Sequence, residues 1–184
     1  MKKATGFLVA ALFPILSPAT ARAVELQGGL GLTAYGSSWR GDVGGGGMLH
    51  LGVRFSRVIA LDFLGWESLA RVDRRVNTGL TFGVVGYLPR EGTRPFSRLF
   101  AIHQHEEGLV SVEASPATVA LGIGAGIRHR VGVGLSLGAA VPVTNGEKSV
   151  WSVTPRATAI FLPDPLGPKL YFGVESTFGF DMVL

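Results

Sequence analysis

The densest group of chemically capable side chains in this sequence is His103-Gln104-His105-Glu106-Glu107. Residues two apart on a β-strand point to the same side, so His103 and His105 could share a proton or a metal ion. Glu107 would extend the pair as a third ligand or as an acid-base partner. Two histidines fall short of the three or four protein ligands of a usual metal site. We therefore expect no metal and no cofactor, and we interpret the pair as structural, bonded to neighbouring polar groups.

The composition of the whole chain excludes several classes of protein. The 184 residues include no cysteine and 27 glycines, and 47% are hydrophobic against 16% charged; the mean hydropathy is +0.36. A disordered chain would be less hydrophobic and more charged, and a disulfide-stapled domain would need cysteines. A nucleic-acid binder would need clustered Lys and Arg. The length allows one domain with a sizeable core, or one membrane barrel.

The first 23 residues have the three parts of a secretory signal peptide. Met1-Lys2-Lys3 is a short positive start, Gly6 to Leu16 is apolar, and Ala21-Arg22-Ala23 places small residues at the cleavage position. Removing residues 1–23 leaves 14 basic and 13 acidic residues, so most of the formal charge of +4 belongs to the export signal. This near-neutral mature chain, residues 24–184, gives no reason to expect a nucleic-acid partner.

Apolar residues of the mature chain recur with a period of two, which predicts β-strands. No window approaches the ~20 consecutive apolar residues of a spanning helix. The clearest alternation runs through residues 117–128 and 130–141, across a turn at Arg128-His129-Arg130. We predict nine strands, over residues 24–35, 47–56, 58–67, 78–88, 96–105, 117–128, 130–141, 150–161 and 169–180.

Short and long connections alternate along this series, which favours an up-and-down barrel. Gly36 to Gly47, with Gly44 to Gly47 as a flexible loop, Ser68 to Asn77, and Glu106 to Pro116 are the expected long loops. A closed antiparallel barrel of this kind needs an even number of strands. Either Leu109 to Ala114 adds a tenth, short strand, or one predicted segment lies outside the wall, so we expect eight to ten.

Two arrangements of the strand faces are open, because alternation alone does not say which face is inside. A soluble lipocalin-like carrier would bury its apolar face, whereas a membrane barrel turns that face to lipid. Charged residues and glycines at mid-strand favour the membrane barrel. We then expect a polar network in the lumen, made of Arg54, Asp62, His103, Arg156 and Glu175. We expect interfacial aromatic belts from Tyr35, Trp66, Tyr87, Phe96, Trp151, Phe161, Tyr171 and Phe180.

Two segments resemble known outer-membrane proteins. The strand, tight turn and strand of Gly52 to Asp62 are similar to a unit of the opacity-protein and outer-membrane-protein A/X-like barrels, and Gly122 to Arg130 resembles their glycine-rich penultimate hairpin. The resemblance implies an all-β, closed antiparallel up-and-down transmembrane barrel in the outer membrane of a Gram-negative bacterium. The chain departs from the pattern at its end, where Phe178-Gly179-Phe180 is followed by four more residues instead of a terminal aromatic.

For such a barrel we expect a structural, surface-interaction or minor small-solute transport role, as a monomer. Its partners would be outer-membrane lipids, lipopolysaccharide and the outer-membrane assembly machinery. Arg71, Arg74 and Arg75 fall in an expected outer loop and could contact lipopolysaccharide phosphates. The alternative is a membrane-embedded, lipid A deacylase-like hydrolase that uses His103 or His105. The deacylase pattern of a His two residues before a Ser is absent, because His105 occupies that position.

Overall fold

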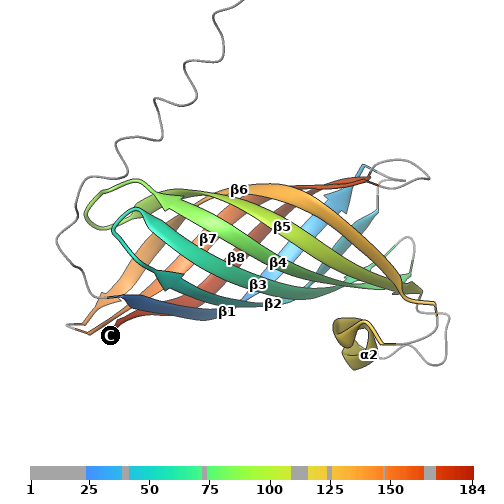
Figure 1. The fold of residues 1–184 in the computed structure, drawn as a ribbon, viewed down its shortest axis with the longest axis horizontal. Coiled ribbons are helices and arrows are strands. Elements are labelled where there is room, and N and C mark those ends of the chain that lie inside the picture. The colour runs from blue at the N-terminus through green and yellow to red at the C-terminus, as the bar shows by residue number, and fades with distance from the viewer. Residues whose placement is uncertain are drawn as a thin grey trace, which may run out of the picture.

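The chain forms a closed barrel of eight antiparallel strands, each paired with the next and β1 paired with β8 (Figure 1). The computed structural model describes residues 24–38, 42–71, 74–108, 116–123, 126–146, 148–163 and 169–184. The strands are β1 Glu25–Ser37, β2 Val43–Arg54, β3 Ile59–Ala70, β4 Arg75–Tyr87, β5 Arg94–Gly108, β6 Arg128–Asn145, β7 Ser149–Leu162 and β8 Lys169–Val183, with one short helix, α2, at Pro116–Leu121. No helix in the described part of the chain is long and apolar enough to cross a membrane.

The two ends of the barrel differ. The start of β1 and the C-terminus lie together at one end, and α2 lies outside the wall at the other (Figure 1). We call these the terminal end and the α2 end. At the terminal end, the β2–β3 connection spans only residues 55–58 and the β6–β7 connection residues 146–148. The β5–β6 connection at the α2 end is the longest, at residues 109–127.

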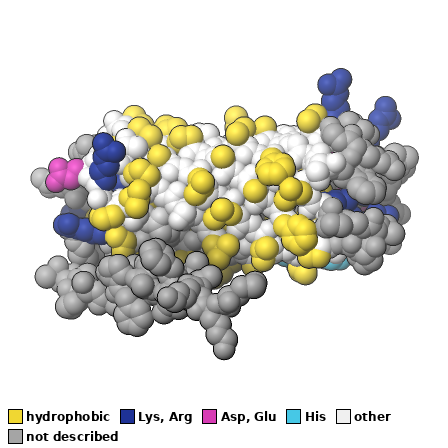
Figure 2. Space-filling model, turned by 90° about the horizontal axis from the view of Figure 1, so that it is seen from above, with side chains coloured by type: hydrophobic (Ala, Val, Ile, Leu, Met, Phe, Trp, Pro, Cys, Tyr) yellow, Lys and Arg dark blue, Asp and Glu magenta, His cyan; other side chains and the backbone are white. Residues whose placement is uncertain are grey.

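Within the strands, the apolar residues of the alternating pattern lie on the outside of the wall, as the membrane arrangement predicts. Leu30 and Leu32 on β1 are 69% and 73% exposed, whereas the intervening side of the same strand is turned to the lumen. Figure 2 shows hydrophobic side chains spread along the body of the barrel, with the visible charged side chains at its two ends. A soluble lipocalin-like barrel would show the opposite distribution, so the structure does not support that alternative.

The predicted strand over residues 117–128 is wrong, and so is the predicted hairpin at its end. Pro116–Leu121 is a helix that ends in a Schellman motif: Gly122 N–H donates to the Val119 carbonyl at 3.1 Å, and Ile123 N–H to the Thr118 carbonyl at 3.0 Å. Gly122 has φ +65°, a left-handed conformation that glycine adopts without strain. Apolar and small residues alternate in this segment, as they do in a strand, and this alternation led to the wrong prediction. The wall accordingly has eight strands, and β6 begins at Arg128.

The strands also extend into segments that we expected to be loops. Gly44 to Gly47 belongs to β2 and pairs with both β1 and β3. A Cβ on Gly46 would lie 1.8 Å from the carbonyl oxygen of Glu67, so the close approach of these strands requires a glycine there. Residues 1–23 and the proposed tenth strand at Leu109 to Ala114 fall outside the described residues.

Most of the aromatic residues assigned to interfacial belts instead fill the lumen. Trp151 and Phe161 are exposed on the outer face, where Trp151 stacks on Phe178 with ring centroids 5.3 Å apart. Five others point inward and are buried or half-buried: Tyr35, Trp66, Tyr87, Phe96 and Tyr171. The belt prediction was wrong for these five because an eight-stranded lumen is narrow enough to be filled by side chains and needs large ones to fill it.

Candidate functional site

A buried ion pair occupies the middle of the lumen. Arg98 on β5 is 1% exposed and Asp62 on β3 is 3% exposed, and Arg98 Nε donates to Asp62 Oδ1 at 2.7 Å. Arg98 Nη2 also donates to Thr81 Oγ1 at 2.8 Å, and the guanidinium carbon lies 4.4 Å from the centre of the Phe100 ring. His50 Nε2 lies 3.6 Å from the other oxygen of Asp62. Hydrogen bonds and an opposite charge thus compensate the burial of both charges.

A second set of charges continues this network toward the terminal end. Arg156 Nε lies 3.6 Å from Glu175 Oε2, and Arg156 Nη2 donates to Thr177 Oγ1 at 3.0 Å. At the mouth, Asp181 accepts from Arg94 at 2.5 Å and lies 3.3 Å from Arg54. Arg54 also pairs with Glu25. Charged pairs therefore line the mouth at the terminal end, where Glu25, Arg54 and Arg94 also border a hollow of about 330 Å³.

The α2 end of the lumen contains a carboxylate that our sequence reasoning did not assign. Glu106 is 2% exposed and lies among three cations: Arg75 at 2.5 Å, Arg130 at 3.2 Å and Lys169 at 3.7 Å. Glu106 and its three cations come from four different strands, β5, β4, β6 and β8 respectively. Their gathering depends on the closure of the barrel, which no local sequence pattern reveals.

An apolar layer separates the central ion pair from the Glu106 cluster. It consists of buried residues from five strands: Met48, Leu64, Trp66, Phe100, Ile102, Ile160, Leu162 and Tyr171. On the terminal side, the cavity lined by residues that include His50, Asp62 and Arg156 has a volume of about 20 Å³, room for roughly one water molecule. Among the described residues, charges and apolar side chains together fill the cross-section of the lumen.

Four of the five residues expected in the lumen network lie there, and His103 does not. Along β5, Arg98, Gln104 and Glu106 are buried inside, so the intervening positions face outward. His103 is one of these and lies on the outer face of the wall near the α2 end. The hydrophobic alternation misled us about β5, since its lumen positions include the apolar residues Phe100 and Ile102.

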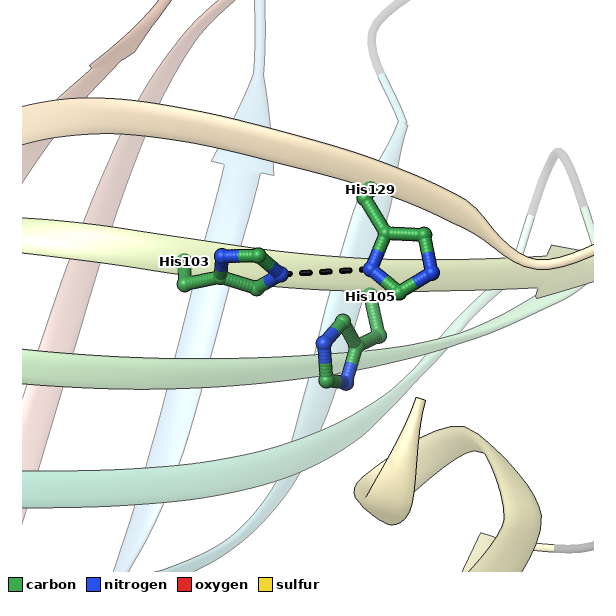
Figure 3. A group of neighbouring side chains, drawn as sticks. All are labelled: His103, His105 and His129. Atoms are coloured by element: carbon green, nitrogen blue, oxygen red, sulfur yellow. Dashed lines mark hydrogen bonds between the residues drawn. The ribbon is translucent and has the colours of Figure 1, made fainter. Parts of the chain in front are cut away.

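The outer face of β5 and β6 carries a cluster of three histidines, His103, His105 and His129 (Figure 3). His103 Nε2 lies 3.2 Å from His129 Nδ1, and the centroids of the His105 and His129 rings are 4.8 Å apart. His105 is buried, whereas His129 is exposed. We missed His129 because we placed it in a turn, whereas it pairs directly with His105 across the two strands. Glu107 is buried on the same outward side of β5 but is not part of this cluster.

The three arginines assigned to lipopolysaccharide lie in two environments. Arg71 and Arg74 are exposed in the β3–β4 connection at the α2 end. Arg75 begins β4 and pairs with Glu106 inside the lumen. The arrangement leaves Arg71 and Arg74 available to an external anion, and it gives Arg75 a structural partner.

Comparison with known proteins gives a likeness in structure only. The chain matches no protein-family model and no curated protein. It is similar to the solved structure of Neisserial surface protein A, with a TM-score of 0.60 and 10% identity over 88% of this chain and 97% of that one. The fold is that of the small outer-membrane barrels.

Two further solved structures align with lower scores. The N-terminal β-barrel domain of Pseudomonas aeruginosa OprF aligns with a TM-score of 0.49 and 13% identity, over 84% of this chain and 96% of that one. The attachment invasion locus protein Ail of Yersinia pestis aligns with a TM-score of 0.46 and 11% identity, over 85% of this chain and 99% of that one.

Proposed function

We propose that this protein is an integral outer-membrane barrel of a Gram-negative bacterium whose lumen is sealed, and that it has a structural or surface-interaction role. The observation that carries the proposal is the filled lumen inside an apolar outer wall. Buried pairs such as Asp62–Arg98 lie in series with the apolar layer around Trp66. Passage of a solute would require separating these pairs, and unpaired charges in a narrow interior are costly. The role of minor solute transport is therefore less favoured than the other two.

The α2 end would face outward in the membrane, with both ends of the mature chain on the periplasmic side. Short periplasmic turns and longer external connections are the usual arrangement of bacterial outer-membrane barrels, and the longest connection here is at the α2 end. This orientation would place Arg71 and Arg74 at the level of the outer leaflet. Their guanidinium groups suit the phosphates of lipopolysaccharide, since arginine binds phosphate through paired hydrogen bonds.

A liposome swelling assay tests the sealed lumen. Vesicles that contain the purified protein should swell in an isosmotic solution of a small sugar no faster than protein-free vesicles, while vesicles with a general porin swell quickly. A positive control within the same chain is the variant Asp62→Ala/Trp66→Ala/Arg98→Ala, which removes the central pair and the largest side chain of the apolar layer in series with it, and which should raise the rate. Rapid swelling with the unaltered protein would overturn the proposal of a sealed barrel.

Membrane fractionation and gel mobility test the location. The mature protein should be recovered in the outer-membrane fraction, and its migration on a detergent gel should change on boiling, because a closed barrel resists the detergent until heated. Recovery in the soluble periplasmic fraction would contradict the location.

A further inference from the structure

Three of the four histidines in the chain lie together on the outer wall, beside α2. His105 on β5 and His129 on β6 are directly opposite in the strand register, and His103 lies two residues before His105 on the same face. One candidate ligand atom from each ring falls within 4.8 Å of the others. The sequence offered two histidines for a metal, and the strand pairing supplies the third.

The spacing of two of the nitrogens suits a shared metal ion. His103 Nε2 and His129 Nδ1 are 3.2 Å apart. In a tetrahedral site with zinc–nitrogen bonds of about 2.0–2.1 Å, two ligand nitrogens are about 3.3–3.4 Å apart. Because each of these nitrogens points toward the other ring (Figure 3), a metal ion could bind both after a small displacement.

The third histidine is held in an orientation typical of a metal ligand. His105 Nδ1 lies 2.9 Å from the carbonyl oxygen of Val119 in α2. Since a carbonyl only accepts, Nδ1 carries the proton, and the lone pair is on Nε2. A hydrogen bond from the far nitrogen to a backbone carbonyl is the usual support of a histidine that binds a metal.

The glycine that ends α2 also allows the backbone to approach the cluster. A Cβ on Gly122 would lie 2.9 Å from Nε2 of His105 and 3.1 Å from Cε1 of His129. The helix therefore lies against the histidines at a distance that only glycine permits. In this way α2 both orients His105 and covers one side of the cluster.

We propose that His103, His105 and His129 form a binding site for a divalent transition metal on the outer face of the barrel. Three imidazoles suit zinc, copper or nickel, whereas magnesium and calcium prefer oxygen ligands. Three protein ligands leave a fourth position for water or for an external group. The bound metal would connect β5, β6 and, through Val119, α2.

Titration calorimetry with zinc tests the site on the full mature protein, purified in detergent without a polyhistidine tag. The protein should bind one zinc ion and show no heat of binding with magnesium. The variants His103→Gln, His105→Gln and His129→Gln should each lower the affinity at least tenfold. His50→Gln is the matched control, because His50 is the fourth histidine and lies in the lumen beside Asp62, and its affinity should stay within twofold.

Each variant is checked for a change of gel mobility on boiling, so that a loss of binding is not confused with a loss of folding. A second measurement needs no variant: zinc should shift the ring-proton NMR signals of three histidines and leave the fourth unchanged. Absence of zinc binding, equal binding by all four variants, or a shift of the His50 signal alone would each overturn the proposal.

Discussion

The variant Asp62→Asn should destabilise the barrel strongly. The substitution keeps the shape of the side chain but removes its charge, and so leaves the guanidinium of Arg98 without a counter-ion. Arg98 is 1% exposed and cannot move to solvent, since it also donates to Thr81 and lies over the ring of Phe100. Removing one partner of a buried ion pair typically costs about 3–5 kcal/mol. That is a large share of the ~5–15 kcal/mol stability of a typical domain.

The matched comparison is the double variant Asp62→Leu/Arg98→Met, which replaces both charges by apolar side chains. Such replacements are often neutral or stabilising by about 1–4 kcal/mol. We therefore expect the double variant to be within about 1 kcal/mol of the unaltered protein, or more stable. The single variants Asp62→Leu and Arg98→Met complete the cycle, and each should be less stable than the double variant.

Reversible urea unfolding in lipid vesicles measures these free energies. Trp66 in the lumen and Trp151 on the outer face report unfolding by fluorescence, and the fraction of compact, unboiled protein on a gel reports it independently. The two probes should give one midpoint if unfolding is two-state. A cost below about 1 kcal/mol for Asp62→Asn, or a double variant as unstable as the sum of its single variants, would refute this account of the pair.

Three further predictions concern packing, binding and processing. Gly79→Ala should cost about 1–3 kcal/mol in the same urea assay, because its Cβ would lie 2.2 Å from a lumen indole ring, whereas Gly47→Ala, with no atom within 4 Å of its Cβ, should change stability little. The double variant Arg71→Ser/Arg74→Ser should weaken binding to lipopolysaccharide micelles at low salt, measured by fluorescence anisotropy. The control is Arg57→Ser, at the terminal end, and an equal loss of binding in the control and the double variant would contradict a lipopolysaccharide contact by Arg71 and Arg74. Intact mass spectrometry of the protein from outer membranes should give the mass of the chain without its first 23 residues, and the full-length mass would contradict cleavage.

Much of the fold could be predicted from the sequence, because strand periodicity is a local property. The alternation of Leu49, Leu51 and Val53 with small or polar residues gave the correct outer face of β2. The local pattern failed between residues 117 and 128, where Val119, Leu121 and Ile123 alternate with small residues as they would in a strand. The helix that ends before Gly122 has only six residues and is too short to show a helical period in the sequence.

The candidate sites were less predictable, since they depend on which strands become neighbours. The Glu106 cluster draws its cations from three other strands, and one of them, Lys169, lies across the lumen on β8. The histidine cluster needed the β5–β6 register, which puts His129 opposite His105. The spacing of residues along one strand predicted that His103 and His105 share a face. It could not predict that His129 on the next strand joins them.

Closure of the barrel into a narrow lumen also explains glycines that lie beside large side chains. Large lumen side chains lie against glycines on a neighbouring strand: Trp66 is opposite Gly79, and Phe100 is opposite Gly134, with clearance for an added Cβ of only 2.2 Å in each case. A narrow lumen has room for an indole or a phenyl ring where the paired residue on the neighbouring strand has no side chain. Glycine and aromatic residues therefore act as pairs across strands, and this pairing fills the lumen while leaving the outer face free to be apolar.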